Sequence, residues 1–270
     1  MNQSNGSYET YKGALFLLSG ASDGMGLAVA RQLVNQGADV ILLSRSEELL
    51  LKRQQELATE GNGQVEIAPL DIADKNTAKR AAEIVGKRKL RGVLLNAGGP
   101  EAATASSLKW EDFERANSLV LAGPAMLINS LIPSLEAPGA SVVAITSITV
   151  KEPTESLTLS GTYRLALVAF LKHLANQLGP KGIRVNNVAP GYTKTESLKA
   201  LMKKRASDLS GNVTEEALAD LEKQWITGIP LGRLASPDEI AAACIYLFSQ
   251  NASFITGQTL TVDGGMTRGY

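Results

Sequence analysis

A glycine-rich turn at residues 19–26 constrains this chain more than any other feature, because it stands between an apolar run and a helical pattern. Residues 14–19 are apolar enough for a buried strand, and residues 26–36 repeat apolar side chains at helical spacing. The glycines of the turn carry no Cβ, so the backbone can bend sharply and approach a ligand closely. The free N–H groups and the positive dipole at the start of the helix attract an anion. The turn therefore predicts a site for a phosphate or pyrophosphate, with an ordinary strand-to-helix turn as the alternative.

The composition excludes several classes of protein. A chain of 270 residues with 44% hydrophobic side chains can bury the core of one large α/β domain. The formal net charge is zero, which argues against nucleic acid as a partner. Cys244 is the only cysteine, so we expect no internal disulfide and a reducing, cytoplasmic location. Residues 1–10 lack the apolar centre of a signal peptide, and no apolar run reaches the length of a membrane span.

Apolar runs alternate with helical patterns along the chain. Strands are predicted at residues 14–19, 39–44, 64–70, 92–96, 141–146, 183–188 and 259–262, and helices at residues 26–36, 46–60, 74–88, 110–135, 157–179 and 237–249. Strands that are apolar on both faces and separated by helices form parallel sheets. The pattern predicts an α/β fold with one doubly wound parallel sheet of about seven strands and helices on both faces. We expect residues 1–270 to form a single domain, with ligands at the carboxyl ends of the strands.

Short motifs follow the ends of several predicted strands. They are Asp71-Ile72, Asn96-Ala97-Gly98, Ser147, Ile183-Arg184-Val185-Asn186, Pro190-Gly191 and residues 255–265. Together with the glycine-rich turn and Asn117, they resemble the classical short-chain dehydrogenase/reductase family over nearly the whole chain. The resemblance implies a Rossmann-type sheet with strand order 3-2-1-4-5-6-7, a bound nicotinamide dinucleotide and usually a homotetramer. It also implies that the helices at residues 110–135 and 157–179 are the dimer faces.

The end of the second predicted strand, Ser44-Arg45-Ser46, indicates which dinucleotide is bound. Members of such folds that prefer NAD place an acidic side chain there for the ribose 2′-hydroxyl. This chain instead offers the guanidinium of Arg45 and two serine hydroxyls, which suit a 2′-phosphate. We therefore expect NADP(H), with NAD(H) less favoured. The alternative for Arg45 is a solvated loop cation.

The resemblance assigns further contacts to the dinucleotide. Asp71 would bind the adenine amino group and Ile72 would pack on the ring, although Asp71 could instead cap a helix before Ala73. Thr193 would meet the nicotinamide carboxamide. The full set of expected cofactor-binding residues is Gly20, Ser22, Asp23, Gly24, Met25, Gly26, Ser44, Arg45, Ser46, Asp71, Ile72, Asn96, Ala97, Gly98, Arg164, Pro190, Gly191 and Thr193.

The catalytic positions depart from the family pattern of Asn, Ser, Tyr and Lys. Asn117 and Ser147 match the first two. The tyrosine and lysine positions, which have i, i+4 spacing on one helix, fall on Ser160 and Arg164. A count forward from Ser147 and a count back from residues 182–186 agree on Arg164. The chain is most similar to a divergent group of 3-oxoacyl-carrier-protein reductase-like members that lacks the Tyr-x-x-x-Lys pair.

The altered pair limits the chemistry at these positions. Arg164 keeps a positive charge and can donate to ribose hydroxyls, but a guanidinium does not relay protons. Ser160 is a poor acid or base without a strong partner. Tyr163, close by on the same helix, is a candidate substitute for the missing phenol, with packing between helices as the alternative. Tyr192 is a second candidate.

Other reactive side chains are expected to lie outside the chemistry. His173, the only histidine, lies about half a helical turn around from Arg164 and should face away from the cofactor. Cys244 sits in an apolar helical run and is expected in the core. No cluster of histidine, cysteine and carboxylate residues has metal-ligand spacing, so no metal is expected.

Residues 193–228 are expected to form a substrate lid over the strand ends. Their apolar side chains, Met202 and Trp225 among them, favour a small-molecule substrate with apolar parts. The alternative is that these side chains only hold two helices together. Residues 203–205 form a basic cluster that suits an anionic carrier or phosphate, or else a solvated face.

Three functions are compatible with these features. The favoured one is an NAD(P)(H)-dependent oxidoreductase acting on a carbonyl or alcohol, with an altered proton relay at Ser160 and Arg164. The second is another reaction, such as that of a lyase or isomerase, in the same pocket. The third is a dinucleotide sensor or an inactive partner subunit. The altered pair weighs against the first function, and the lid weighs against the third.

Overall fold

A single parallel sheet is the centre of the computed structural model, which describes residues 11–154, 156–210 and 213–269. Residues 1–10, where no signal peptide is expected, lie outside this part of the chain. The strand order β3-β2-β1-β4-β5-β6-β7 and the parallel pairing confirm the predicted fold. The strands are β1 (Leu15–Ser19), β2 (Asp39–Ser44), β3 (Val65–Pro69), β4 (Leu90–Leu95), β5 (Ser141–Ile145), β6 (Arg184–Pro190) and β7 (Thr259–Val262).

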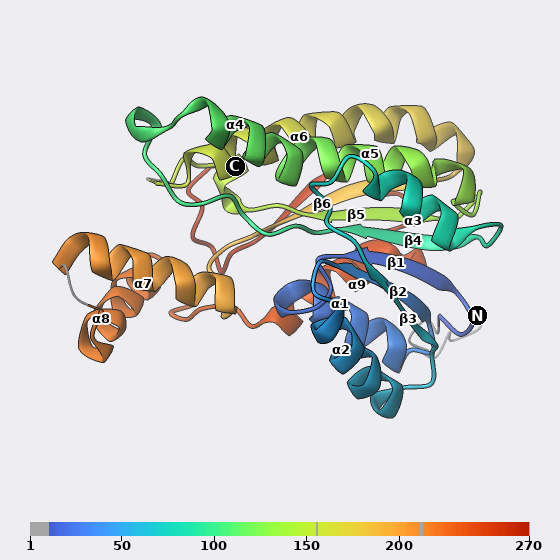
Figure 1. Cartoon of the computed structure of the whole chain (residues 1–270), viewed down its shortest axis with the longest axis horizontal. Helices are drawn as coiled ribbons and strands as arrows, with labels where there is room; N and C mark the ends of the chain where they lie inside the picture. The colour runs from blue at the N-terminus through green and yellow to red at the C-terminus, as the bar shows by residue number, and fades with distance from the viewer. Residues whose placement is uncertain (1–10, 155, 211–212, 270) are drawn as a thin grey trace, which may run out of the picture.

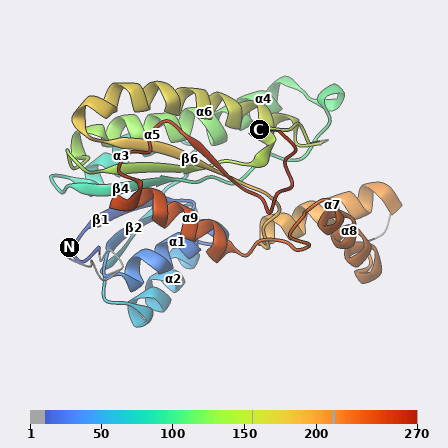
Figure 2. The same ribbon diagram turned by 180° about the vertical axis from the view of Figure 1, so that it is seen from behind.

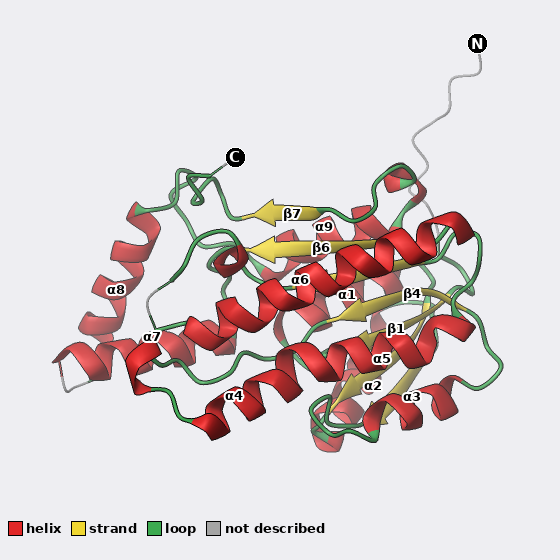
Figure 3. Ribbon diagram, turned by 90° about the horizontal axis from the view of Figure 1, so that it is seen from above, coloured by secondary structure: helices red, strands yellow, loops and turns green. Residues whose placement is uncertain are grey.

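Helices cover both faces of this sheet, as Figure 1 and Figure 2 show. One face carries α1 (Gly24–Asn35), α2 (Glu47–Glu60) and α9 (Pro237–Phe248), and the other carries α3 (Thr77–Val85), α4 (Trp110–Ala116), α5 (Gly123–Leu131) and α6 (Thr158–Leu178). Two further helices, α7 (Glu196–Ser210) and α8 (Glu215–Thr227), project beyond the carboxyl ends of the strands, toward which the arrows in Figure 3 point. The predicted lid therefore stands at the edge of the sheet where ligands bind in such folds.

Helix α3 is shorter than the sequence predicts. Helical spacing predicts a start at residue 74, whereas α3 begins at Thr77. The carboxylate of Asp74 accepts a hydrogen bond from the Asn76 N–H at 2.8 Å. Asp74 thus closes a turn before the helix starts, which is a common use of a short polar side chain.

The helix predicted at residues 110–135 is one continuous stretch but not one α-helix. It contains a wider π-helical segment at Asn117–Ala122 and ends in a 3₁₀ turn at Ile132–Ser134. Pro124 has no N–H for the helical ladder. Gly123 lies so close to Ile72 that a Cβ would be 2.1 Å from the Ile72 carbonyl oxygen. The proline and this close approach disturb the helix where periodicity alone predicts a regular one.

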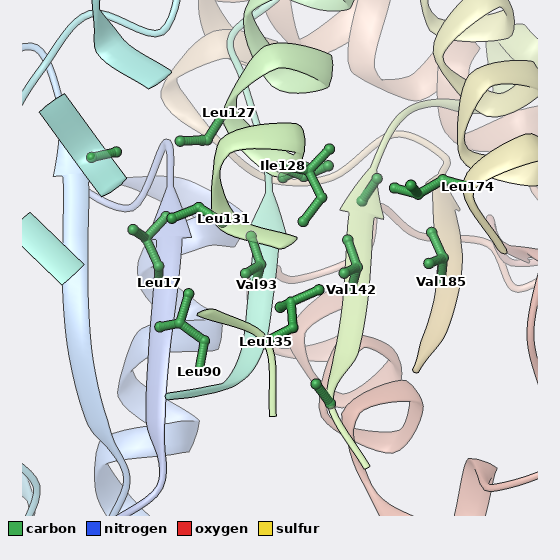
Figure 4. Packing of buried hydrophobic residues seen from close by; sticks show 14 of the residues in the cluster. Leu17, Leu90, Val93, Leu127, Ile128, Leu131, Leu135, Val142, Leu174 and Val185 are labelled. Atoms are coloured by element: carbon green, nitrogen blue, oxygen red, sulfur yellow. The ribbon is translucent and has the colours of Figure 1, made fainter. Parts of the chain in front are cut away.

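Two apolar layers bury the sheet, one on each face. Figure 4 shows the layer beneath α3, α5 and α6, to which the labelled side chains Leu17, Leu90, Val93, Leu127, Ile128, Leu131, Leu135, Val142, Leu174 and Val185 belong. The opposite layer lies beneath α1, α2 and α9 and contains Phe16. The Phe16 ring contacts Tyr11 and Phe248 edge to face, with centroids 5.2 and 5.3 Å apart. The site therefore stands on a sheet whose central strands, β1 and β5 among them, are fully buried.

Replacing Phe16 with alanine should lower the free energy of unfolding by about 3–5 kcal/mol. The ring is fully buried, so its removal leaves a cavity between Tyr11 and Phe248. Urea denaturation measures the change. Leu51→Ala, at an exposed position on α2, is the control and should change the stability by less than about 0.5 kcal/mol. Equal losses in both variants would contradict this account of the core.

Within the described residues, one helical stretch, Trp110–Ser134, is long and apolar enough by composition to cross a membrane. The prediction that no apolar run is long enough to span a membrane is therefore wrong for this stretch, by length and composition. Core helices of soluble proteins pass the same test. Leu127, Ile128 and Leu131 are fully buried against the sheet, as Figure 4 shows. Packing in the fold therefore explains the apolar side chains on the inner face of this stretch.

Helices α7 and α8 pack against each other. Met202, Leu221 and Trp225 form a small buried cluster that is separate from the two layers of the sheet. The ring of Tyr192 stacks on Trp225, with centroids 4.5 Å apart and an interplanar angle of 12°. The helix pair thus has a core of its own, joined to the end of β6 through Tyr192.

Candidate active site

The glycine-rich turn between β1 and α1 is held against the end of β4. Gly20 has a φ of +60°, and a Cβ there would lie 2.6 Å from the Asn96 carbonyl oxygen. A Cβ on Gly26 would lie 2.2 Å from the Gly20 carbonyl oxygen. The Asn96 side chain donates to that Gly20 oxygen at 3.0 Å, and the Asn96 N–H donates to Ser19 Oγ at 2.9 Å. Close backbone contacts therefore require both glycines and leave the start of α1 open to a ligand.

A groove of about 420 Å³ runs along the carboxyl ends of these strands. It brings together residues that the sequence places far apart, from the glycine-rich turn, the ends of β2 and β4, the segment after β3, and α6. The expected cofactor-binding residues that line it are Gly20, Ser22, Asp23, Gly24, Met25, Ser44, Arg45, Asp71, Ile72, Asn96, Ala97, Gly98 and Arg164. The position of this groove at the carboxyl ends of the strands suits a nucleotide.

The serines near β2 divide between two roles. Ser46 does not line the groove; its Oγ accepts the Leu49 N–H at 3.3 Å and caps α2. Ser22 and Ser44 lie with their hydroxyl oxygens 2.8 Å apart at the groove wall. Arg45 is exposed and makes no hydrogen bond or ion pair with any other described residue. A cation and two hydroxyls are thus available at the position expected for a 2′-phosphate.

Asp71 combines both interpretations made from the sequence. Its carboxylate accepts the Ala73 N–H at 2.9 Å, as the capping alternative predicts. Asp71 also lines the groove beside Ile72. The cap closes a turn ahead of α3, and it orients the carboxylate without removing it from the groove.

A second, larger cavity of about 570 Å³ adjoins the groove. We call it the substrate cavity. Nine expected site residues line it: Met25, Arg45, Gly98, Ser147, Ser160, Arg164, Pro190, Gly191 and Thr193. The groove and the substrate cavity share Met25, Arg45, Gly98, Gly99, Arg164, Thr195 and Ser197. Arg164 is thus at the junction of the two spaces.

Arg164 is a buried cation, only 8% exposed. Its Nε donates to Ser160 Oγ at 3.2 Å, its Nη1 to the Ile145 carbonyl at 3.2 Å, and its Nη2 to the Ala97 and Gly98 carbonyls at 3.3 and 3.5 Å. All these partners are uncharged, so no described carboxylate neutralises the guanidinium. Burial lowers the pKa of Arg164 to about 10, and the group therefore stays protonated at neutral pH. A buried charge without a counter-ion is costly and attracts an anion.

Two serine hydroxyls face the same space. Ser160 Oγ accepts from Arg164, so its own proton is free to be donated elsewhere. Ser147 follows β5, and its Oγ accepts the Thr149 N–H at 3.2 Å at the start of a short 3₁₀ turn. Two hydroxyl donors beside a buried cation can polarise a carbonyl oxygen or stabilise negative charge on it.

The other candidate catalytic residues lie apart from the cavity. Asn117 begins the π-helical segment, and neither it nor Tyr163 lines the groove or the substrate cavity. Tyr163 is half-buried on α6. Tyr192 does line the substrate cavity, and burial raises the pKa of its hydroxyl. Of the two tyrosines considered from the sequence, the structure thus places Tyr192 at the cavity.

The remaining reactive groups lie outside both spaces. His173 is exposed on α6 and lines neither. Cys244 is fully buried, which raises the pKa of its thiol. In the part of the chain that the structure describes, no group of three or more histidine, cysteine or acidic side chains could hold a metal ion.

The lid contributes different residues from those that the sequence favours. Met202 and Trp225 pack within the helix pair and do not line the substrate cavity, as the alternative interpretation predicts. The apolar lining comes instead from Leu198 and Leu201. Lys204, from the basic cluster, also lines the cavity.

Sequence reasoning missed several polar residues at this site, among them Thr195, Ser197 and Glu101. Thr195 and Ser197, at the start of α7, line both the groove and the substrate cavity, and Glu101 lines the cavity from the loop after β4. Each follows the carboxyl end of a strand closely. That position could have identified them, because ligands of parallel sheets bind at these ends.

Comparison with known sequences agrees with this arrangement. Residues 20–267 match a family model described as enoyl-(acyl carrier protein) reductase. The chain is 29% identical over 253 residues to the 3-oxoacyl-[acyl-carrier-protein] reductase FabG of Chlamydia muridarum, covering 93% of this chain and 96% of that protein. It is 30% identical over 252 residues to the uncharacterized oxidoreductase YmfI of Bacillus subtilis, covering 92% and 97%.

Comparison with solved structures shows the same fold. The L-sorbose reductase of Gluconobacter frateurii, solved with NADPH and L-sorbose, superposes with a TM-score of 0.87 at 24% identity over 97% of this chain and 99% of that chain. A 7α-hydroxysteroid dehydrogenase, solved with NADH and a 7-oxo bile acid, gives 0.84 at 26% identity and 95% of each chain. The chain therefore belongs to the short-chain dehydrogenase/reductase family of oxidoreductases.

Proposed function

We propose that this chain is an NADP(H)-dependent oxidoreductase that interconverts a carbonyl compound and an alcohol through an altered proton relay. The junction at Arg164 carries the proposal. A buried guanidinium without a described acidic partner lies where the nucleotide groove meets the substrate cavity, and it donates to Ser160. A cavity that opens onto a nucleotide groove beside a cation suits a reaction between a cofactor and a polar substrate.

The groove fits a nicotinamide dinucleotide. The close backbone contacts at Gly20 and Gly26 leave no room for a Cβ. No side chain from these two positions therefore covers the start of α1. The N–H groups of that helix end can bind a pyrophosphate. The exposed Arg45 guanidinium favours NADP(H) over NAD(H), because it can pair with a 2′-phosphate. When bound, the dinucleotide supplies or accepts a hydride.

The serines and the arginine handle the oxygen and its proton. In the direction of reduction, Ser147 and Ser160 donate hydrogen bonds to the substrate carbonyl oxygen. As this oxygen gains charge, Ser160 passes it a proton, and Arg164 stabilises the serine oxygen until water reprotonates it. Both oxygens belong to alcohols, so the transfer is close to thermoneutral. The guanidinium therefore replaces the usual lysine as an electrostatic partner, not as a proton carrier.

The lid and the assembly complete the proposal. Residues 193–228, which are part of one domain spanning residues 1–270, close over the substrate, and Leu198 and Leu201 contact its apolar parts. Trp110, Met126 and Leu165 expose large apolar side chains on α4, α5 and α6, which supports association of copies through these helices. The proposed homotetramer is what the family resemblance implies. Light scattering after size exclusion tests this assembly. A single, buried Cys244 suits a reducing cytoplasm.

A spectrophotometric assay tests the function. Loss of NADPH absorbance is followed with a panel of aldehydes, ketones, keto esters and cyclic ketones, while calorimetry measures NADPH affinity. Turnover of at least one carbonyl compound is expected. Tight NADPH binding without turnover of any compound would contradict the proposal and favour the sensor or inactive subunit, to which the Ser160 and Arg164 substitutions point.

Replacing Arg45 with aspartate should reverse the preference between the dinucleotides. A carboxylate repels the 2′-phosphate and can accept from a ribose 2′-hydroxyl, so the ratio of Kd values should move toward NADH by roughly 100-fold. Calorimetry with NADPH and NADH measures both constants. Lys12→Asp carries the same charge change beside Gly37, at the opposite end of α1 from the groove, and should leave the ratio unaltered. An unchanged preference for NADPH in the Arg45 variant would refute the role given to this side chain.

A further inference from the structure

A third hollow of about 290 Å³ opens beside the substrate cavity, and we call it the side pocket. The substrate cavity and the side pocket share three lining residues, Ala102, Leu201 and Lys204. The two spaces therefore adjoin each other between the loop after β4 and helix α7. The roles proposed above for the groove and the substrate cavity leave the side pocket without a function.

The side pocket has a polar and cationic lining. Lys204 and Arg205 contribute two positive side chains from α7, and Thr104, Ser107 and Ser156 contribute hydroxyls from the facing loops. None of the described residues that line it is acidic. The Thr104 hydroxyl donates to Ser107 Oγ at 3.2 Å and the Ser107 hydroxyl to the Thr104 carbonyl at 3.0 Å, so the attraction for a carboxylate or phosphate comes from the two cations.

Hydrogen bonds hold the facing wall in shape. The Ala103 N–H donates to the Ser156 carbonyl at 2.7 Å, and Thr158 Oγ1 donates to the Ala103 carbonyl at 3.1 Å. Ser156 has a φ of +62°, a left-handed conformation that is unfavourable for a residue other than glycine. Such strain gathers at ligand sites, where the surrounding structure maintains it. Across the pocket from this wall, the Arg205 guanidinium lies 5.9 Å from the centroid of the Trp225 ring.

The substrate cavity connects the catalytic hydroxyls with the side pocket. Leu157, Leu198 and Leu201 line it together with Ser147, Ser160 and Lys204. Glu101 also lines this cavity but does not line the side pocket. A molecule that reaches from the serines to Lys204 thus passes through a cavity that offers both aliphatic and polar side chains.

We propose that the side pocket is an anion subsite, so that the substrate carries a carboxylate or phosphate at the end remote from its reacting carbon. An apolar chain joins the two ends. This inference rests on the proposed function, since the substrate cavity defines which end reacts. It deepens that function by naming the substrate class as carbonyl compounds with an anionic group remote from the reacting carbon.

Direct binding tests the subsite without any turnover. The chain has two tryptophans, so a Trp110→Phe background leaves Trp225, beside Arg205, as the fluorescent reporter. Octanoate, octyl phosphate and the neutral octanamide are titrated with and without saturating NADPH, and calorimetry measures the same Kd values independently of the fluorescence signal. At least one anion should bind roughly tenfold more tightly than the amide. The anion that binds with the lower Kd shows whether the side pocket prefers a carboxylate or a phosphate.

Two variants with the same charge change show whether the preference for the anion arises in the side pocket. Lys204→Gln should reduce the preference for the anion to about threefold or less, because it replaces a charged donor of the side pocket with a neutral one. Lys203→Gln makes the same change on the neighbouring residue, which is exposed and does not line the side pocket, and should keep the full preference. Equal binding of anion and amide by the parent protein would overturn the proposal. So would equal losses in the two variants, since a general surface charge would then explain the preference.

The two proposals fail separately. NADPH affinity and turnover of the carbonyl panel are measured on the same Trp110→Phe protein. Absent NADPH binding with an intact anion preference would refute the proposed oxidoreductase alone. Turnover without an anion preference would refute the subsite alone.

Discussion

Replacing Arg164 with methionine should lower kcat for reduction of a carbonyl compound by roughly 10²–10³-fold, the cost of losing one preorganised charge at a developing oxyanion. The Kd for NADPH should change by less than about tenfold, because the glycine-rich turn and Arg45 still bind the phosphates. The melting temperature should fall, because the buried Ile145 carbonyl, the Ala97 carbonyl and Ser160 Oγ lose their donor. If Arg164 served only to stabilise the fold, the variant would have a lower melting temperature and an unchanged kcat for the folded fraction.

Arg184→Met is the matched control for this variant. Arg184 is also a buried arginine, 9% exposed, but it donates to the carbonyls of Leu247, Phe248 and Ser249 at the end of α9, far from the substrate cavity. Its loss should lower the melting temperature and spare kcat. If the two arginine variants lose the same activity, Arg164 has no special part in the reaction.

The pH profile and a double variant add further readouts. Arg164 is protonated below its pKa of about 10, and its charge is lost only as the pH rises through that value. The value of kcat/KM should therefore be level from about pH 6 to pH 9. Ser160→Tyr with Arg164→Lys introduces the family's usual pair. A gain in carbonyl reduction would mean that the present site is only degenerate, and a loss would mean that Ser160 and Arg164 have a chemistry of their own.

Replacing Gly26 with alanine should weaken NADPH binding by roughly 5- to 150-fold, which corresponds to an overpacking cost of about 1–3 kcal/mol. A Cβ at this position would lie 2.2 Å from the Gly20 carbonyl oxygen and 2.9 Å from Asn96 Nδ2. The start of α1 must then move away from β4, which displaces the N–H groups proposed to bind the pyrophosphate. Calorimetry with NADPH measures the loss, and thermal melting shows how much of it arises from the fold.

Gly179→Ala is the control for the glycine variant. Gly179 ends α6 with a φ of −53°, and a Cβ there would meet nothing within 4 Å. This variant should bind NADPH like the parent protein. Equal affinity in the Gly26 and Gly179 variants would show that the close contact at the turn does not shape the nucleotide site.

Much of the architecture could be predicted from the residues because the signals are local. Apolar runs and helical spacing predict the strand and helix order, since each element needs one buried face whatever its neighbours are. The glycines at residues 20 and 26 report a backbone contact that only a residue without Cβ permits. Counting from Ser147 predicts Ser160 and Arg164, which lie in hydrogen-bond contact because i, i+4 residues share a helix face.

Only the tertiary structure decided which side chains face the chemistry. Tyr163 and Tyr192 are equal candidates by residue type, but Tyr192 lies on a segment that enters the substrate cavity and Tyr163 does not. Met202 on α7 and Trp225 on α8 pack in one apolar cluster, and Ser46 caps α2. None of these three residues therefore lines the groove or the substrate cavity. The burial of Arg164 among neutral carbonyls likewise depends on the ends of β4 and β5, which are distant in sequence. Short-range pattern sets what each segment becomes, whereas the contacts between segments determine where a side chain points, and the proposed function depends on the latter.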